Sequence, residues 1–347
     1  MIQRKKTKEV KIGNLKIGGN NPIRVQSMCN TKTSDVDSTV KQILELESVG
    51  CEIIRIAVPD IESAKQINKI KKQINIPLVT DIHYDYALAL ECIKQGIDKI
   101  RINPGNISED KLKIIIKEAK NKKIPIRIGI NIGSLPKKIM EKFGSSPKAI
   151  VESALETIKI CEDLNFHNII VSLKSSDIFE TIGANKLFSE KSNYPLHLGI
   201  TESGTEKGGI IKSSIGIGAL LLEGIGDTIR VSLSADPKKE IFAGYSILKS
   251  LKLRKGAILI SCPTCARAKI DVIKIAKEVE EKLTKIDKPI KVGILGCFVN
   301  ADEAKMADIG IAGRENGGIL FKNGKVIRNV GKENLVEELL NELEKLE

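Results

Sequence analysis

Three cysteines in the last third of this 347-residue chain have a spacing that suits a metal centre. Cys262 and Cys265 form a Cys-Pro-Thr-Cys motif, and Cys297 follows in the sequence Leu-Gly-Cys-Phe-Val-Asn. A structural zinc site closes with four Cys or His ligands, but the chain has only three histidines and all lie far upstream. Three thiolates with one position left to a weaker ligand are typical of a reactive iron–sulfur cluster that binds substrate at one iron.

Arginines form the second group of residues with evident chemistry. The chain contains 10 Arg and 46 Lys, yet five of the arginines fall within short β-branched runs. A planar guanidinium binds phosphate oxygens bidentately, which an ammonium cannot do. Arg24 lies at the start of its run, whereas the other four lie further along theirs, and these four predict recognition of a multiply phosphorylated ligand. The alternative is that each arginine pairs with a carboxylate across a sheet. The four are Arg55, Arg101, Arg127 and Arg230.

These residues lie on eight predicted strands, and the intervening stretches have helical periodicity. Strand–helix alternation repeated eight times is typical of a (β/α)₈ TIM barrel, which occupies about 250 residues. A doubly wound sheet has the same alternation, but eight strands favour closure over five or six. The predicted strands are 23–28, 51–58, 77–83, 99–104, 125–132, 168–176, 195–203 and 228–237.

The remaining segments predict a small hairpin and a second domain. The segment 10–19 reads as a hairpin that caps the bottom of the barrel. After residue 255 a new pattern begins, with strands at 257–261, 290–297 and 309–312, a helix at 270–283, a hairpin at 319–330 and a terminal helix at 332–346. We therefore expect a barrel over residues 1–255 and an α+β cluster domain over 256–347, which holds all three candidate thiols.

Active sites of such barrels lie at the carboxyl ends of the strands. Glu202 is the candidate for proton transfer, because a carboxylate in a cationic cleft is ionised; a salt bridge to one of the arginines is the alternative. Gly208-Gly209 and residues 213–218, Ser-Ser-Ile-Gly-Ile-Gly, are expected to open a helix at 219–223 whose N–H groups bind phosphate, with simple loop packing as the alternative. The other polar residues toward these strand ends are Asp81, His83, Asn103, Asn131, Lys174, His197 and Ser232.

Composition limits the classes of function. The net charge is +12, but the lysines are spread over helical segments, only 3% of residues are aromatic and Trp is absent, so base-stacking platforms are scarce. No apolar run reaches the ~18 residues that a membrane span needs. The N-terminus lacks a secretory signal, and seven scattered cysteines indicate a reducing compartment, so we expect a cytoplasmic protein.

A basic, zinc-stapled RNA-binding protein is the competing interpretation, and a pterin-type barrel enzyme is a third.

Ten short motifs together point to one family. They are Val25–Met28, Arg55–Pro59, Asp81–His83, Lys99–Asn106, Pro125–Gly129, Ser172–Ser176, Pro195–Gly199, Ile217–Leu221, Gly226–Arg230 and Ser261–Cys265. With these motifs the chain resembles 4-hydroxy-3-methylbut-2-enyl diphosphate synthase over nearly its whole length. The resemblance implies reductive ring opening of 2-C-methyl-D-erythritol 2,4-cyclodiphosphate in the non-mevalonate isoprenoid pathway. It also implies a 4Fe-4S cluster, flavodoxin or ferredoxin as electron donor, and a homodimer in which one subunit's cluster domain closes the other's barrel.

The resemblance also implies roles for individual residues. Cys262, Cys265 and Cys297 would be the thiolate ligands, and Glu202 would serve proton transfer. The family's Gly-Pro-Gly-Glu-Ala turn after the last cysteine is replaced here by Ala-Asp-Glu-Ala, one residue shorter. Glu303 is the equivalent of the fourth ligand, with Asp302 as the adjacent alternative. The expected substrate-binding residues are Arg55, Asp81, His83, Arg101, Asn103, Arg127, Asn131, Lys174, Arg230 and Ser232.

Overall fold

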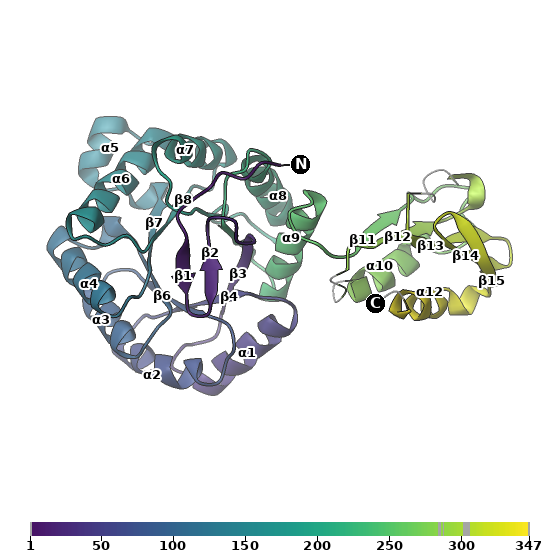
Figure 1. Ribbon diagram of the computed structural model, residues 1–347, viewed down its shortest axis with the longest axis horizontal. Helices are drawn as coiled ribbons and strands as arrows, with labels where there is room; N and C mark the ends of the chain where they lie inside the picture. Colours follow the sequence, from purple (N-terminus) through teal and green to yellow (C-terminus); the bar gives the residue numbers. More distant parts are fainter. Residues whose placement is uncertain (1, 284–285, 287, 301–305, 346–347) are drawn as a thin grey trace. The chain divides into compact units, whose positions relative to one another are not determined.

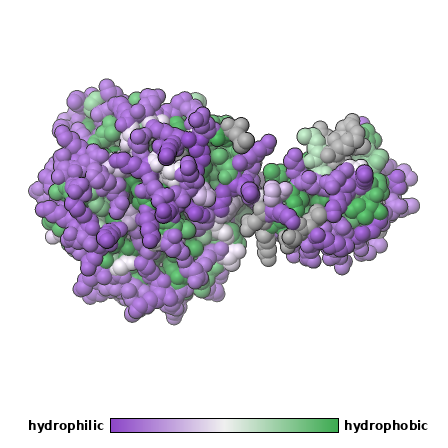
Figure 2. Space-filling model, in the orientation of Figure 1, coloured by the Kyte–Doolittle hydropathy of each residue, from purple (hydrophilic) through white to green (hydrophobic). Residues whose placement is uncertain are grey.

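The computed structural model describes residues 2–283, 286, 288–300 and 306–345. The chain divides into two units, Met1–Leu253 and Arg254–Glu347. In both units, hydrophilic residues dominate the face shown in Figure 2. Among the described residues, no helix combines the length and the apolar character that a bilayer crossing requires.

The first unit is a closed parallel barrel. Its strands follow the order β8-β7-β6-β5-β4-β3-β10-β9, and every neighbouring pair is parallel. A parallel bridge between Val171 and Leu196 joins β8 to the residue before β9 and closes the ring. The predicted TIM barrel is thus confirmed, and the doubly wound alternative is wrong. The strands are β3 (Arg24–Met28), β4 (Ile53–Ala57), β5 (Leu78–Ile82), β6 (Lys99–Ile102), β7 (Ile126–Asn131), β8 (Ile169–Lys174), β9 (His197–Leu198) and β10 (Thr228–Ile229).

The last two strands are much shorter than the predicted runs 195–203 and 228–237. Each has two residues in the ladder, because the chain beyond them turns into loops at the barrel mouth. There Ser203 Oγ donates to the Ser232 carbonyl, and the Ser234 N–H donates to the Gly204 carbonyl at 2.9 Å. Side-chain and loop hydrogen bonds thus replace the ladder at this part of the mouth.

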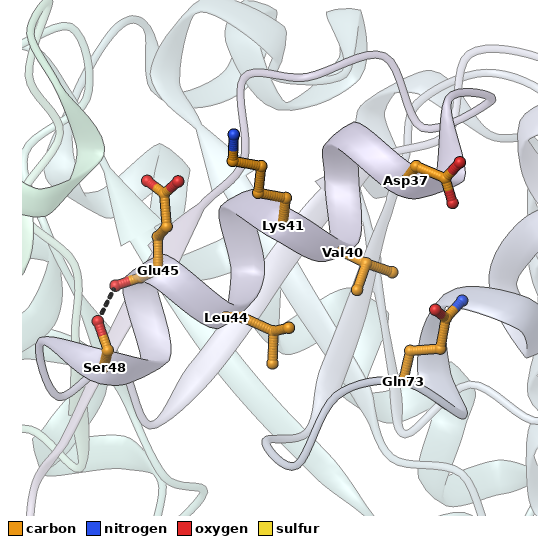
Figure 3. A pocket seen from close by; sticks show the side chains of 7 residues that line it. All are labelled: Asp37, Val40, Lys41, Leu44, Glu45, Ser48 and Gln73. Atoms are coloured by element: carbon orange, nitrogen blue, oxygen red, sulfur yellow. Dashed lines mark hydrogen bonds between the residues drawn. The ribbon is translucent and has the colours of Figure 1, made fainter.

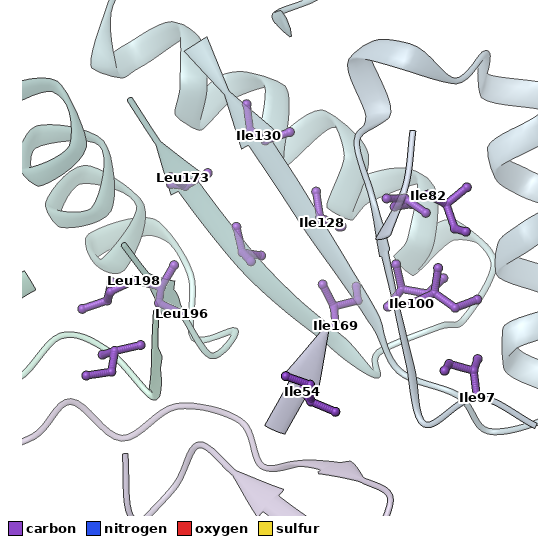
Figure 4. Close-up of a cluster of buried hydrophobic side chains, with 14 of the residues drawn as sticks. Ile54, Ile82, Ile97, Ile100, Ile128, Ile130, Ile169, Leu173, Leu196 and Leu198 are labelled. Carbon is purple, nitrogen blue, oxygen red and sulfur yellow. The ribbon is translucent and has the colours of Figure 1, made fainter. Parts of the chain in front are cut away.

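Helices surround the barrel (Figure 1). Six of them begin at an Asp or Ser whose side chain accepts an N–H of the first turn, which satisfies donors that a helix start leaves free. Alternate strand residues such as Ile100, Ile128 and Ile130 pack into a core with the helices (Figure 4). The helices are α1 (Val36–Ser48), α2 (Ile61–Lys71), α3 (Tyr86–Lys94), α4 (Glu109–Asn121), α5 (Lys137–Phe143), α6 (Pro147–Asp163), α7 (Ile178–Lys191), α8 (Glu206–Leu222) and α9 (Pro237–Ser250).

The predicted hairpin, strands β1 (Val10–Ile12) and β2 (Leu15–Ile17), lies across one end of the barrel (Figure 1). Its side chains form an apolar cluster with residues from the first halves of the barrel strands. This plug closes the end at which the strands begin, so polar side chains further along the strands face the opposite mouth. The cluster consists of Val10, Ile12, Ile17, Ile53, Val79 and Ile170.

In the described residues of the second unit, a five-stranded mixed sheet packs with two α-helices, in agreement with the predicted α+β pattern. The pairs β11–β12 and β12–β13 are parallel, whereas β13–β14 and β14–β15 are antiparallel. The strands, in their order in the sheet, are β11 (Ile258–Ser261), β12 (Lys291–Leu295), β13 (Ile309–Arg314), β14 (Gly317–Lys322) and β15 (Lys325–Val330). The final hairpin turns at Asn323 and Gly324, whose φ of 49° and 72° suit a tight turn. The helices α10 (Val272–Leu283) and α12 (Leu335–Glu344) contribute to the core of this sheet.

Candidate active site

Three charged side chains lie side by side on neighbouring strands. Strand register pairs Asp81 with Arg101 and Arg101 with Arg127. Arg101 Nη1 donates to Asp81 Oδ1 at 2.9 Å, and Arg55 Nη1 lies 3.7 Å from Asp81 Oδ2. Burial alone would raise the pKa of Asp81, but the charges of Arg55 and Arg101 and a hydrogen bond with His83 hold it well below its usual range. Asp81 is therefore an ionised anchor for two guanidinium groups.

His83 lies at the rim of the same cluster. Its side chain is 46% exposed, and Nε2 lies 3.5 Å from Asp81 Oδ2 and 3.2 Å from Arg101 Nη1. The predicted residues Arg55, Asp81, His83 and Arg101 are thus brought together. The Asp81 carboxylate is occupied by cations, so it positions the arginines and has little capacity to meet an anion itself.

Arg230 is held by a residue that the sequence analysis missed. Glu240, in the first turn of α9, accepts from Arg230 Nε at 3.1 Å and from Nη2 at 2.9 Å. The same carboxylate accepts from Ser27 Oγ at 2.8 Å and from the Leu233 N–H at 3.0 Å. Glu240 is buried, and it ties β3, the guanidinium and the loop after β10 together. Because Glu240 lies on a helix, the search for polar residues along predicted strands did not identify it.

Arg55 keeps donors for a ligand. Its Nε and Nη2 contact the thioether of Met28 at 3.1 and 2.9 Å, and a thioether is a weak acceptor. Arg230 Nη1 approaches the same sulfur at 3.8 Å. Met28 therefore lies between two guanidinium groups without neutralising either, a role that its sequence context did not reveal.

Two glycines make room for cations inside the barrel. A Cβ on Gly129 would lie 2.5 Å from Arg101 Nε, and one on Gly199 would lie 2.7 Å from Lys174 Nζ. Lys174 makes no hydrogen bond or ion pair with a described residue that the structure records. Burial, together with nearby guanidinium groups, lowers its pKa well below the usual value. Period-two alternation along β7 and β9 would have placed both glycines on the inner face.

The predicted amide and hydroxyl ligands also lie at the strand ends. Asn103 is buried; its Nδ2 donates to Ser134 Oγ at 2.8 Å, and its Oδ1 accepts from the Gly105 N–H at 3.1 Å. Asn131 ends β7, and its carbonyl accepts from Ser134 Oγ at 3.2 Å. Ser232 is half-buried, and its carbonyl accepts from Ser203.

Glu202 stands on a constrained turn after β9. Its φ of 51° is uncommon for a residue with a side chain, and its carboxylate is exposed. The turn is fixed by the buried Ser203, which bonds to Ser232, and by a bridge between Thr205 and Ser234. No carboxylate–guanidinium pair of Glu202 is recorded among the described residues, so the salt-bridge alternative finds no support.

The expected phosphate-binding helix start at residues 213–218 is wrong. Helix α8 begins at Glu206, so Gly208 and Gly209 lie in its first turn, whereas residues 213–218 lie in its interior. Their N–H groups are committed to the helix ladder, because only the first four N–H groups of a helix lack partners. Ser213 and Gly216 are buried, and a Cβ at Gly216 would lie 2.5 Å from Ile200 Cδ1. The glycine there permits close packing.

Cys262 comes one residue after β11 and Cys297 two residues after β12, and these neighbouring parallel strands pair Ser261 with Ile294. The Gly296 N–H donates to Cys262 Sγ at 3.0 Å, and Cys265 is exposed in the following loop. Within the described ranges no three His, Cys, Asp or Glu side chains are gathered as a metal site. Glu303 and Asp302 lie outside the described residues.

The remaining cysteines and histidines are structural. Burial raises the pKa of Cys29, Cys51, Cys92 and Cys161 to about 12, so these four thiols are unreactive at neutral pH. His167 Nδ1 lies 3.1 Å from the Tyr194 hydroxyl. His197 is fully buried in the barrel.

A groove of about 540 Å³ follows the outer face of α1 (Figure 3). It lies outside the barrel and contains none of the predicted site residues. Leu44 and Val40 contribute apolar walls, and Lys41 is its one cation. This composition does not suit a phosphorylated ligand. Its lining residues are Asp37, Val40, Lys41, Leu44, Glu45, Ser48 and Gln73.

Known proteins resemble the whole chain. The family described as "GcpE TIM-barrel domain" matches residues 7–245, and "GcpE protein C-terminal domain" matches residues 258–345. The "4-hydroxy-3-methylbut-2-en-1-yl diphosphate synthase (flavodoxin)" of Caldicellulosiruptor saccharolyticus is 58% identical over 97% of this chain and 98% of that protein. The protein of the same name from Clostridium perfringens is 54% identical over 99% of each.

Solved dihydropteroate synthases align with about 70% of this chain. Dihydropteroate synthase from Stenotrophomonas maltophilia aligns with a TM-score of 0.53 at 12% identity, over 70% of this chain and 97% of that protein. A likeness at this identity concerns the fold. It does not extend to a pterin substrate.

Proposed function

The chain belongs to the GcpE family of 4-hydroxy-3-methylbut-2-en-1-yl diphosphate synthases, and we propose that its barrel mouth binds the two phosphates of the cyclic substrate. The enzyme reductively opens and dehydroxylates 2-C-methyl-D-erythritol 2,4-cyclodiphosphate to 4-hydroxy-3-methylbut-2-enyl diphosphate, which takes two electrons. Both the pterin-type and the RNA-binding interpretations are thereby replaced.

One observation carries the binding proposal: cations outnumber carboxylates inside the barrel. The two carboxylates, Asp81 and Glu240, are both occupied by guanidinium groups. With every one of these side chains ionised, four more positive than negative charges would face one another in a low-dielectric interior, and an anion with two charges offsets part of this repulsion. The cations are Arg55, Lys99, Arg101, Arg127, Lys174 and Arg230.

The arginines would orient the substrate as well as bind it. Arg101 and Arg230 are each fixed by a carboxylate, so little side-chain freedom is lost when they bind phosphate oxygens. Lys174 and Arg127 bring further charge without a fixed partner. Glu202, on its constrained turn, would carry the proton that accompanies the loss of the hydroxyl.

The donor set in the second unit fits an iron–sulfur cluster. We propose that Cys262, Cys265 and Cys297 hold a 4Fe-4S cluster, with Glu303 as fourth ligand. Soft thiolates suit iron–sulfur centres, and the Gly296 N–H to Cys262 Sγ bond is of the kind that tunes such clusters. When bound, the cluster supplies single electrons to the substrate. Thiolates of this kind persist in a reducing cytoplasm.

Anaerobic metal analysis tests this part of the proposal. Iron and acid-labile sulfide are expected in roughly 4:4 ratio per chain in protein purified without oxygen. Cys262→Ser should lower both, whereas the buried Cys161→Ser should not. Glu303→Gln should destabilise the cluster and Asp302→Asn should not. Stoichiometric zinc without iron would overturn the proposal, and the reverse pattern of the two acidic variants would reassign the fourth ligand.

The named relatives use flavodoxin, and we propose flavodoxin as the electron donor here and a homodimer as the active form. In that dimer the cluster unit of one subunit would serve the barrel of its partner. Mixing Cys262→Ser with Lys174→Gln subunits tests this arrangement, because a heterodimer then contains one intact pair of barrel and cluster. Recovered activity in the mixture is expected; a mixture as inactive as its parents would contradict it.

A further inference from the structure

A second level of polar side chains lies deeper in the barrel than the arginines that grip the ligand. Lys99 and Gln26 each precede a mouth residue by two positions on β6 and β3. His197 occupies the corresponding depth on β9, and its Nδ1 lies 2.8 Å from Thr228 Oγ1. All are 0–1% exposed. The barrel interior directly beneath the proposed phosphate site is therefore polar and shielded from bulk solvent.

This inner level has too few acceptors for its donors. Gln26 Nε2 and His197 Nε2 are buried without a hydrogen-bond partner, as are the Nε and Nη1 of the adjacent Arg127. Lys99 Nζ has one recorded partner, Gln26 Oε1, at the long distance of 3.4 Å. A charged ammonium has three donors and no acceptor, so protonated Lys99 would worsen the shortage. A neutral amine keeps a lone pair that can accept.

The charges around Lys99 also favour the neutral amine. Arg127 on β7 and Arg55 on β4 are its main electrostatic neighbours, Lys174 on β8 and His197 on β9 complete the ring, and no ion pair of Lys99 with a described carboxylate is recorded. The carboxylates one level above, Asp81 and Glu240, are occupied by arginines. Burial and the Arg127 and Arg55 charges lower the pKa of Lys99 well below its ordinary value.

We propose that Lys99 is a proton-coupled positioning residue for the substrate, neutral in the empty barrel and protonated when the diphosphate is bound. The inference rests on the proposed binding of the diphosphate at the mouth. The anion brings the acceptors and the negative charge that the inner level lacks, and Lys99 then becomes an additional buried cation beneath it. Substrate binding therefore takes up a proton from solution.

The chemistry of the ligand makes this uptake measurable. Each phosphorus of the cyclic diphosphate carries a single ionised oxygen, which is strongly acidic, so the ligand is a dianion throughout the neutral range. Inorganic pyrophosphate would change its own protonation on binding. With the cyclic diphosphate, any net proton exchange belongs to the protein.

The experiment is calorimetric titration of the anaerobically prepared holoenzyme with the cyclic diphosphate, without reductant so that no turnover occurs. Repeating it in two buffers of different ionisation enthalpy at the same pH gives the number of protons taken up. About one proton per site is expected near neutral pH, with the dissociation constant rising up to about tenfold per pH unit. Binding without proton uptake would overturn the inference and leave the proposed function intact. No binding at all would overturn both.

Variants assign the proton to its residue. Lys99→Met should abolish uptake and weaken binding about tenfold or more; Lys99→Arg, which keeps a permanent charge, should abolish uptake as well. His197→Gln and His83→Gln should leave uptake in place. Uptake that persists in both Lys99 variants, or that disappears in either histidine variant, would overturn the inference. If neither Lys99 variant folds, Lys174→Met decides between the two buried lysines: uptake that persists in it supports Lys99, and uptake that disappears in it overturns the inference.

Discussion

The carboxylate of Glu240 holds the guanidinium of Arg230 through two hydrogen bonds, from Nε at 3.1 Å and from Nη2 at 2.9 Å. The two residues belong to different elements, α9 and the segment that follows β10. A bidentate pair fixes the plane of the guanidinium as well as its position. Arg230 is thus presented to the barrel mouth in one orientation before any ligand arrives.

Glu240→Gln should therefore impair catalysis through the position of Arg230. The amide keeps one acceptor but turns a donor toward the guanidinium, so Arg230 gains freedom that substrate binding must remove. We expect kcat/KM to fall about 10- to 100-fold, or about 1.4–2.8 kcal/mol. Steady-state kinetics with the cyclic diphosphate would measure this change.

The matched control is Glu52→Gln. Glu52 accepts from Arg24 Nη1 at 2.7 Å and from the Val25 N–H at 2.9 Å, which is the same kind of pairing at the opposite end of the barrel. It should lower thermal stability and leave KM unchanged. Equal kinetic losses in both variants would show that Glu240 acts only through general stability.

Removing a cation should stabilise the empty barrel. Arg127 is 1% exposed and leaves Nε and Nη1 without partners. Arg127→Met removes an unpaired buried charge while keeping most of the volume, so we expect the melting temperature of the substrate-free protein to rise by about 2–4 °C. Substrate affinity should fall at least about 100-fold, since a buried charge contact to the anion is lost.

Differential scanning calorimetry with and without substrate checks both the melting temperature and the substrate affinity expected for Arg127→Met. The wild type should gain stability on adding the ligand and Arg127→Met should not. Arg24→Met is the control, because it leaves the carboxylate of Glu52 without its arginine and should lower the melting temperature. A lower melting temperature for Arg127→Met than for the wild type would contradict the idea of a strained cationic interior.

The sequence predicted the barrel and most of the mouth because both depend on local patterns. Arg101 and Asn103 could be placed at the mouth from their position on one predicted strand. Glu240 could not, because it reaches the site from a helix, and helical periodicity does not distinguish an inward carboxylate from a solvated one. The prediction for residues 213–218 was wrong for a related reason. The sequence does not distinguish a glycine that permits close helix packing from one in a phosphate-binding loop.

Asp81 should make the stability of the barrel depend on pH in the acidic range. Because the folded-state pKa of Asp81 is held well below the unfolded value of about 3.9, its stabilising effect is present above that value and is lost as the pH falls toward the folded pKa. The difference in melting temperature between the wild type and Asp81→Asn should stay constant from neutral pH to about pH 4 and shrink below it. A difference that disappears already near pH 6 would mean that Asp81 is not paired with Arg55 and Arg101 as described.

The seven cysteines should separate into two reactive classes in protein stripped of metal. Burial raises the pKa of the four barrel thiols to about 12, so their thiolate fraction at neutral pH is on the order of 10⁻⁵. Cys262, Cys265 and Cys297 are exposed or half-buried. A thiol reagent at neutral pH should modify these three rapidly and the other four only after denaturation, with peptide mass spectrometry assigning the sites.

In the cluster-loaded protein the same three cysteines should be protected, since their sulfurs would be bound to iron. Rapid modification of Cys29 in folded protein would show that the barrel mouth opens further than its packing allows.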